Sequence, residues 1–154
     1  MSFEIYKSIK LRCFIIEDYC SETRAYFTLF GEDFPLEEFT REIGIIPTEA
    51  YRKGEECIRG KTKHIRFETA WEYGLDYKMT NHPEEQIHTI INTLYNSIEI
   101  IKKYKDNYNL KCKLVTVICF NRQQTRELVM NNKVIEFANQ VNGEFEFDIN
   151  NDND

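Results

Sequence analysis

The sequence predicts an α+β fold: a two-layer sandwich in which a largely antiparallel sheet of about five strands carries helices mainly on one face. Three observations lead to this class. Short runs with a period of two, typical of strands, are interspersed with apolar stripes at helical spacing. Each helical segment has one apolar stripe, so it can cover only one surface. Polar connections between neighbouring strands favour hairpins.

The chain opens with two β-rich runs, residues 9–16 and 23–30, whose polar connection indicates a hairpin with a long loop. The second run carries apolar groups on both faces, which predicts a strand inside the sheet. A short helix follows, with Asp33 as its expected cap and Gly44 at its end. Its apolar stripe consists of Leu36, Phe39 and Ile43.

Strict alternation from residue 65 to residue 73 predicts a strand with one packed and one wet face. The packed face consists of Ile65, Phe67, Thr69, Trp71 and Tyr73. The only tryptophan is therefore expected first as a core residue and only second as a platform for a ligand.

The clearest helix begins near Asn81, which has capping-box spacing to Glu84, and its apolar stripe continues to Ile101. We expect this helix to lie across the sheet as the main cover of the core. The remaining elements are a central strand at 110–120, a segment at 128–130 that suits strand or helix, a short helix at 131–141 and a last strand at 144–149.

Length and composition predict a single domain at residues 1–149 and a disordered acidic tail at residues 150–154. The net charge of −6 argues against nucleic acid as a partner. The sequence has neither a signal peptide nor an apolar run that could span a membrane, so we expect a cytoplasmic protein. Its five cysteines include no C-x-x-C pair, which favours free thiols.

A cationic loop at residues 47–66 stands out against this acidic chain. Its candidate binding residues are Tyr51, Arg52, Lys53, Arg59, Lys61 and Lys63. The loop could bind an anion or nucleotide, because arginine offers paired donors and lysine a point charge. It could equally steer an acidic protein partner, with Tyr51 as anchor. A solvated loop, partly neutralised by Glu55 and Glu56, is the third alternative.

Other chemistries find less support in the sequence. The histidines at positions 64, 82 and 88 lack the spacing of a zinc site, and we expect no metal and no cofactor. Cys57 lies among basic residues, which favour a thiolate, so a thiol-dependent enzyme stays a distant alternative. The paired carboxylates are expected on the solvated surface.

Several short motifs occur in a characteristic order. They are Gly31-Glu32-Asp33-Phe34, Ile45-Ile46-Pro47-Thr48, Tyr51-Arg52-Lys53-Gly54, Trp71 on a strand, a long amphipathic helix, and Phe145-Glu146-Phe147-Asp148. Over residues 23–149 the chain resembles the bacterial domain-of-unknown-function family 4279. The resemblance implies a small, stand-alone α+β protein and no established activity. The chain departs from the family in its last strand, where similar proteins show two aspartates, and in an added strand before residue 23.

These observations lead us to expect a non-enzymatic protein-binding module of bacterial origin, of the immunity or inhibitor type, that uses the cationic loop. A small-anion or nucleotide-binding domain is the alternative. Homodimerisation through an open edge strand is a further option.

Overall fold

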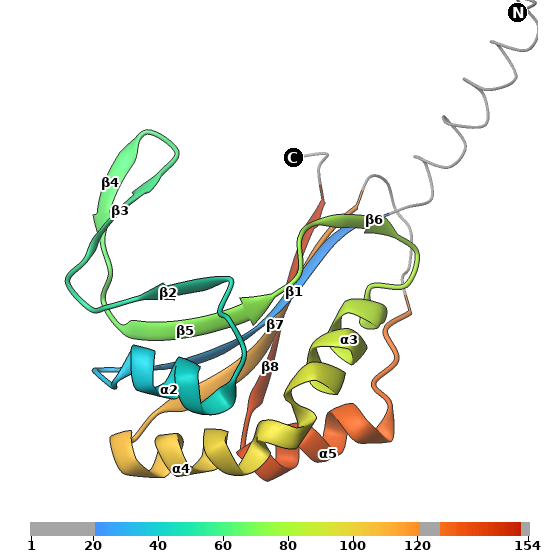
Figure 1. The fold of residues 1–154 in the computed structure, drawn as a ribbon. Coiled ribbons are helices and arrows are strands. Elements are labelled where there is room, and N and C mark those ends of the chain that lie inside the picture. Colours follow the sequence, from blue (N-terminus) through green and yellow to red (C-terminus); the bar gives the residue numbers. More distant parts are fainter. Residues whose placement is uncertain (1–20, 121–126, 152–154) are drawn as a thin grey trace, which may run out of the picture.

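The computed structural model describes residues 21–120 and 127–151 (Figure 1). In chain order its elements are β1 (Ser21–Gly31), α2 (Leu36–Ile43), β2 (Glu49–Tyr51), β3 (Glu56–Arg59), β4 (Thr62–Ile65), β5 (Thr69–Gly74), β6 (Lys78–Thr80), α3 (Glu84–Leu94), η1 (Tyr95–Ser97), α4 (Ile98–Tyr108), β7 (Lys111–Phe120), α5 (Asn132–Val141) and β8 (Glu144–Asn151). The strand expected at residues 9–16, and with it the first hairpin, lies outside the described residues.

Six strands form one mixed sheet, in the order β2-β5-β1-β7-β8, with β6 beside the first residues of β1. The pairings are antiparallel except that of β7 with β8, which is parallel. The α+β class is confirmed, and β1 is the interior strand that its two apolar faces predict. The strands β2 and β6 have three residues each, too few to show a period of two in the sequence.

The described helices gather on one face of the sheet (Figure 1). The core between the two layers includes Phe27 of β1, Leu114 of β7 and Trp71 of β5. Trp71 is fully buried, as predicted, and Phe39 of α2 packs edge-on against it with ring centroids 5.1 Å apart. The indole Nε1 donates a hydrogen bond to Thr40 Oγ1 at 3.1 Å, so the buried polar group is satisfied.

The long helix expected after Asn81 is divided by the 3₁₀ turn η1. Asn96 and Ser97 have short polar side chains that compete with helical backbone bonds, which explains why the division falls there. The two parts have different neighbours: α3, before the turn, contacts β1 and α5, whereas α4, after the turn, contacts α2 and α5. In place of the expected capping box, Pro83 occupies the N-cap position of α3 and offers no side-chain cap bond.

The cap expected for the first helix is also wrong. Pro35 precedes α2 without a side-chain cap bond, and the Asp33 carboxylate lies 3.8 Å from the Arg52 guanidinium instead. The other end agrees with the prediction, because Gly44 adopts a φ of 70°, a left-handed conformation that glycine tolerates best.

The alternation from residue 65 to residue 73 is split between two elements. Thr69 and Trp71 lie in β5 and are buried as expected. Ile65 and Phe67 were expected to pack beside them, but their exposed fractions are 67% and 76%. The physical reason is that β3 and β4 form a separate two-stranded sheet that stands away from the described helices (Figure 1).

The last strand, β8, continues to Asn151, two residues beyond its expected end, so Asn150 and Asn151 belong to the sheet and not to a tail. Residues 152–154 lie outside the described part. Residues 128–130 form neither of the two structures that their sequence suits. Among the described helices, none has the length and apolar character to cross a membrane.

Candidate functional site

The predicted cationic loop has regular structure. β2 holds Tyr51 against β5, and β3 and β4 then form a hairpin that stands away from the sheet (Figure 1). We call residues 55–67 the arm. Backbone bonds close its base: the Arg66 amide donates to the Glu55 carbonyl at 2.8 Å, and the Gly54 amide to the Arg66 carbonyl at 2.8 Å. Apart from their pairing with each other, β3 and β4 do not pack extensively against any described element.

Two of the predicted binding residues, Arg52 and Lys53, are neutralised by the chain itself. Arg52 Nη2 lies 2.5 Å from Glu37 Oε2, and Lys53 Nζ lies 2.5 Å from Glu32 Oε2. The guanidinium holds the pKa of the Glu37 carboxyl below its usual value. These contacts connect the end of β2 to the start of α2. Arg52 and Lys53 therefore each have an acidic partner within the chain, although both pairs are exposed.

The other three predicted cations lie on the arm. Lys63 Nζ is 2.7 Å from Glu56 Oε2, an exposed pair of small energetic value. Arg59 and Lys61 form no ion pair with any residue in the described ranges. They flank Gly60, whose φ of 62° belongs to the hairpin turn. Of the predicted set, Arg59 and Lys61 thus remain available to a partner.

Tyr51 has a structural role at the base of the arm. The Arg66 guanidinium carbon lies 3.7 Å from the centre of its ring, and the same guanidinium contacts Glu49. The Tyr51 hydroxyl donates to Glu72 Oε1 at 3.4 Å. Burial, together with the charge of Glu72, raises the pKa of Tyr51 to about 12. Burial, together with the charge of Glu49, raises the pKa of Glu72.

A pocket of about 250 Å³ lies between the arm and its base. It is lined by Tyr51, Cys57, Arg59, His64, Ile65, Arg66, Phe67 and Glu68. Cys57 and His64 are direct partners across the hairpin. Arg59 and Arg66 make the pocket receptive to a carboxylate or phosphate group, whereas Glu68 opposes one. Burial raises the pKa of Glu68, so this carboxyl is a weaker acid than an exposed one.

The arm also exposes apolar side chains, which the sequence reasoning missed. Ile58 is 79% exposed, and Ile65 and Phe67 are exposed almost as fully. The register pairs Ile58 with Lys63 and Ile65 with Glu56, so the two isoleucines share the face of the hairpin opposite Cys57 and His64. One signal in the sequence could have indicated this hairpin: Gly60 lies between two short runs of residues, as in a hairpin with a two-residue turn.

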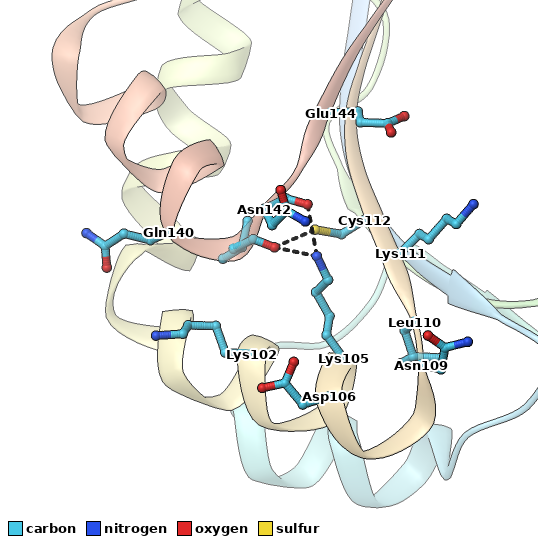
Figure 2. Close-up of a pocket in the computed structure, with 11 residues that line it drawn as sticks. Lys102, Lys105, Asp106, Asn109, Leu110, Lys111, Cys112, Gln140, Asn142 and Glu144 are labelled. Carbon is cyan, nitrogen blue, oxygen red and sulfur yellow. Dashed lines mark hydrogen bonds between the residues drawn. The ribbon is translucent and has the colours of Figure 1, made fainter.

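A hollow of about 490 Å³ lies elsewhere, between α4, the start of β7 and the end of α5 (Figure 2). There the Lys105 ammonium donates to the Val141 carbonyl and, at 2.9 Å, to the Asn142 carbonyl. Cys112 Sγ lies 3.6 Å from the same Val141 oxygen, and burial raises the pKa of its thiol.

Lys105 therefore caps the C-terminal end of α5, where a cation is favoured by the helix dipole. The thiol beside it is held in its protonated, unreactive form. Because the polar groups of this hollow hold the end of α5 in place, we take the arm and not the hollow as the candidate site. Lys105 and Val141 are 36 positions apart, so sequence spacing gave no signal for this cap.

Comparison with known proteins gave one match. A family model described as "Domain of unknown function (DUF4279)" matches residues 21–152, which is most of the chain. The search of curated proteins found no match, and neither did the search of solved structures.

Proposed function

Since the chain belongs to the DUF4279 family, whose description names no activity, we propose a function from the arm: a non-enzymatic module that binds another protein. The observation that carries this proposal is the composition of the arm surface. Exposed apolar side chains lie there beside two cations, Arg59 and Lys61, that have no ionic partner among the described residues. Neither group contributes to the core.

The apolar part of the arm would supply affinity. Ile58, Ile65 and Phe67 lie within a stretch of ten residues, and exposed apolar side chains that cluster in this way commonly mark interaction sites. A two-stranded hairpin is marginally stable in water unless something packs against it. Contact with a partner would both bury these side chains and order the hairpin.

The charged part of the arm would supply selectivity. Arg59 and Lys61 project from a chain whose net charge is −6, so the arm differs in sign from most of the molecule. An acidic surface would be attracted to the arm and repelled by the rest of the protein, which also fixes orientation. The partner that we propose is therefore a protein with an acidic patch beside an apolar one.

The biological setting belongs to the same proposal. Cys57 and Cys112 are free thiols in the described chain, which favours a reducing compartment such as the bacterial cytoplasm. An immunity or inhibitor role would use an arm of this kind to cover a site on another protein.

The alternative function, binding of a small anion or nucleotide, has the pocket between the arm and its base in its favour. Arg59 and Arg66 both line it. Binding of phosphate there would raise the melting temperature above that in chloride of equal ionic strength. A melting temperature that does not respond to phosphate or nucleotide would remove this alternative.

The protein-binding proposal is tested by affinity capture from the native organism with three baits. The first is the unmodified protein, the second carries Arg59→Glu and Lys61→Glu, and the third carries Lys78→Glu and Lys111→Glu. The third bait is the matched control, because it changes net charge equally at exposed positions outside the arm. The proposal expects a protein, identified by mass spectrometry, that the first and third baits retain and the second loses. Equal recovery on all three baits would contradict it.

A further inference from the structure

The sheet ends on β8, at the edge opposite β2 and the arm. Within the described chain, β8 pairs only with β7, so the backbone groups along its outer side are unpaired. Natural proteins usually protect such an edge with a lysine, a proline or a short strand. β8 is eight residues long and has no lysine or proline, and the charged side chains in its sequence, EFEFDINN, are all acidic.

The side chains of β8 form two rows. Phe145 lies opposite the core residue Leu114, so the apolar row faces the helix layer, and it consists of Phe145, Phe147 and Ile149. The rings of Phe145 and Phe147 are stacked, with centroids 6.2 Å apart. Phe145 packs against the core, but Phe147 and Ile149 are 40% and 60% exposed. The helix layer therefore leaves the second half of this row uncovered.

The other row is acidic and lies on the face of the sheet away from the described helices. It consists of Glu144, Glu146 and Asp148. Lys113 Nζ lies 2.6 Å from Glu146 Oε2 and neutralises the middle carboxylate. Glu144 and Asp148 form no ion pair with any residue in the described ranges. The edge thus presents an acidic row, in which Glu144 and Asp148 have no ionic partner in the described ranges, and a partly exposed apolar row.

We propose that the outer edge of β8 is a second interaction surface, which binds an extended segment of a partner protein by adding it to the sheet as a strand. The segment that fits alternates lysine or arginine with apolar residues. Its cations would lie beside Glu144 and Asp148, and its apolar side chains beside Phe147 and Ile149, because side chains of paired strands share faces.

A second copy of this chain fits the edge less well. Antiparallel pairing of two β8 strands would place two acidic rows on the same face, and like charges on facing strands are destabilising. Charge complementarity therefore selects a basic segment over self-pairing. The inference does not depend on the function proposed for the arm, since the two surfaces lie at opposite ends of the sheet.

The test uses the full-length protein and a synthetic peptide of about ten residues that alternates lysine and valine. A second peptide has the same sequence and charge but carries N-methyl groups on consecutive backbone nitrogens of its central part. Because neighbouring N–H groups point to opposite edges of an extended strand, neither edge of this peptide can pair. We expect saturable binding of the first peptide by calorimetry at physiological salt, and a loss of affinity of at least about tenfold for the second.

Two protein variants locate the site. Ile149→Lys places a cation in the apolar row of β8, and Ile46→Lys makes the same change at a position that is 84% exposed and lies outside β8. Both positions are exposed enough for the variants to fold. Ile149→Lys should weaken binding at least about tenfold, while Ile46→Lys should leave it within about twofold.

Three results would overturn the proposal: equal binding of the two peptides, equal effects of the two substitutions, or no binding of the first peptide. The first would show attraction by charge alone, and the second a site away from β8. The third would mean that the edge is closed to a partner, whether by residues 1–20 of this chain, by a second copy or by its own chemistry.

Discussion

The arm and the core between sheet and helices both contain large apolar side chains, but the arm exposes them to solvent and the core buries them. Ile58 and Phe67 of the arm are 79% and 76% exposed, whereas Trp71 of β5 and Phe39 of α2 are fully buried. One alternating run crosses from the first region into the second. A period of two therefore identifies extended backbone, but what lies beneath each face depends on where the helices pack.

The largest difference in the free energy of unfolding is expected between alanine substitutions at Trp71 and at Phe67. Trp71→Ala removes a fully buried ring from the core and should lower the free energy of unfolding by about 3–5 kcal/mol. Phe67→Ala should change it by less than about 0.5 kcal/mol, because its ring is mostly in water. Urea denaturation of both variants measures the difference. A comparable loss for Phe67→Ala would mean that the arm belongs to the core.

The next contrast uses two glycines. A Cβ at Gly74 would lie 2.5 Å from Tyr26 Cβ and 2.8 Å from the Ala25 carbonyl oxygen, so Gly74→Ala should destabilise the fold by about 1–3 kcal/mol. At Gly60 a Cβ would have no heavy atom within 4 Å, and only the backbone conformation is strained. Gly60→Ala should loosen the hairpin locally and leave global unfolding within about 0.5 kcal/mol.

Denaturation monitored by tryptophan fluorescence, which reports the sheet and not the arm, distinguishes the two glycine variants. If Gly60→Ala destabilised the sheet as much as Gly74→Ala, the arm could not be treated as an independent unit.

A smaller effect should follow from the hydrogen bond of the buried indole. Thr40→Val keeps the shape of the side chain but removes the acceptor for Trp71 Nε1, which should destabilise the protein by about 1–2 kcal/mol. Thr62→Val on the arm is the matched control and should have almost no effect. Equal unfolding free energies for the two variants would contradict this role of Thr40.

The smallest effect concerns the boundary between the two regions, where Glu72 accepts the bond from Tyr51. The pKa of Glu72 is raised in the folded protein, so between its unfolded and folded pKa values the folded state binds more protons and stability falls as pH rises. Glu72→Gln should therefore gain stability relative to the parent at pH 8 and gain less at pH 4. The same difference at both pH values would refute this assignment.

The sequence predicts the fold well where apolar residues repeat over a long stretch. The interior position of β1, the burial of Trp71 and the left-handed end of α2 at Gly44 are all confirmed. Local rules fail where a side chain has a better distant partner. Asp33 has the right type and position for a cap, yet its carboxylate lies near Arg52, which no local pattern could indicate.

The candidate site could be predicted only in part. The sequence shows where the cationic segment lies, but it does not show which of its cations have a carboxylate beside them in the folded chain. Arg52 and Lys53 face carboxylates that lie 15 and 21 positions earlier in the chain, whereas Arg59 and Lys61 face none in the described ranges. The exposed Ile58 and Ile65 were missed because exposure depends on the direction in which the hairpin leaves the sheet.

Hydrogen exchange tests the central claim, that the arm is a binding element, most directly. In the free protein, the amides of residues 56–65 should exchange much faster than those of β1 and β7, because the hairpin has no packing partner in the described chain. In complex with the partner captured by the unmodified protein, the account predicts slowed exchange in residues 56–65. Unchanged exchange of the arm, with protection elsewhere on the surface, would contradict it.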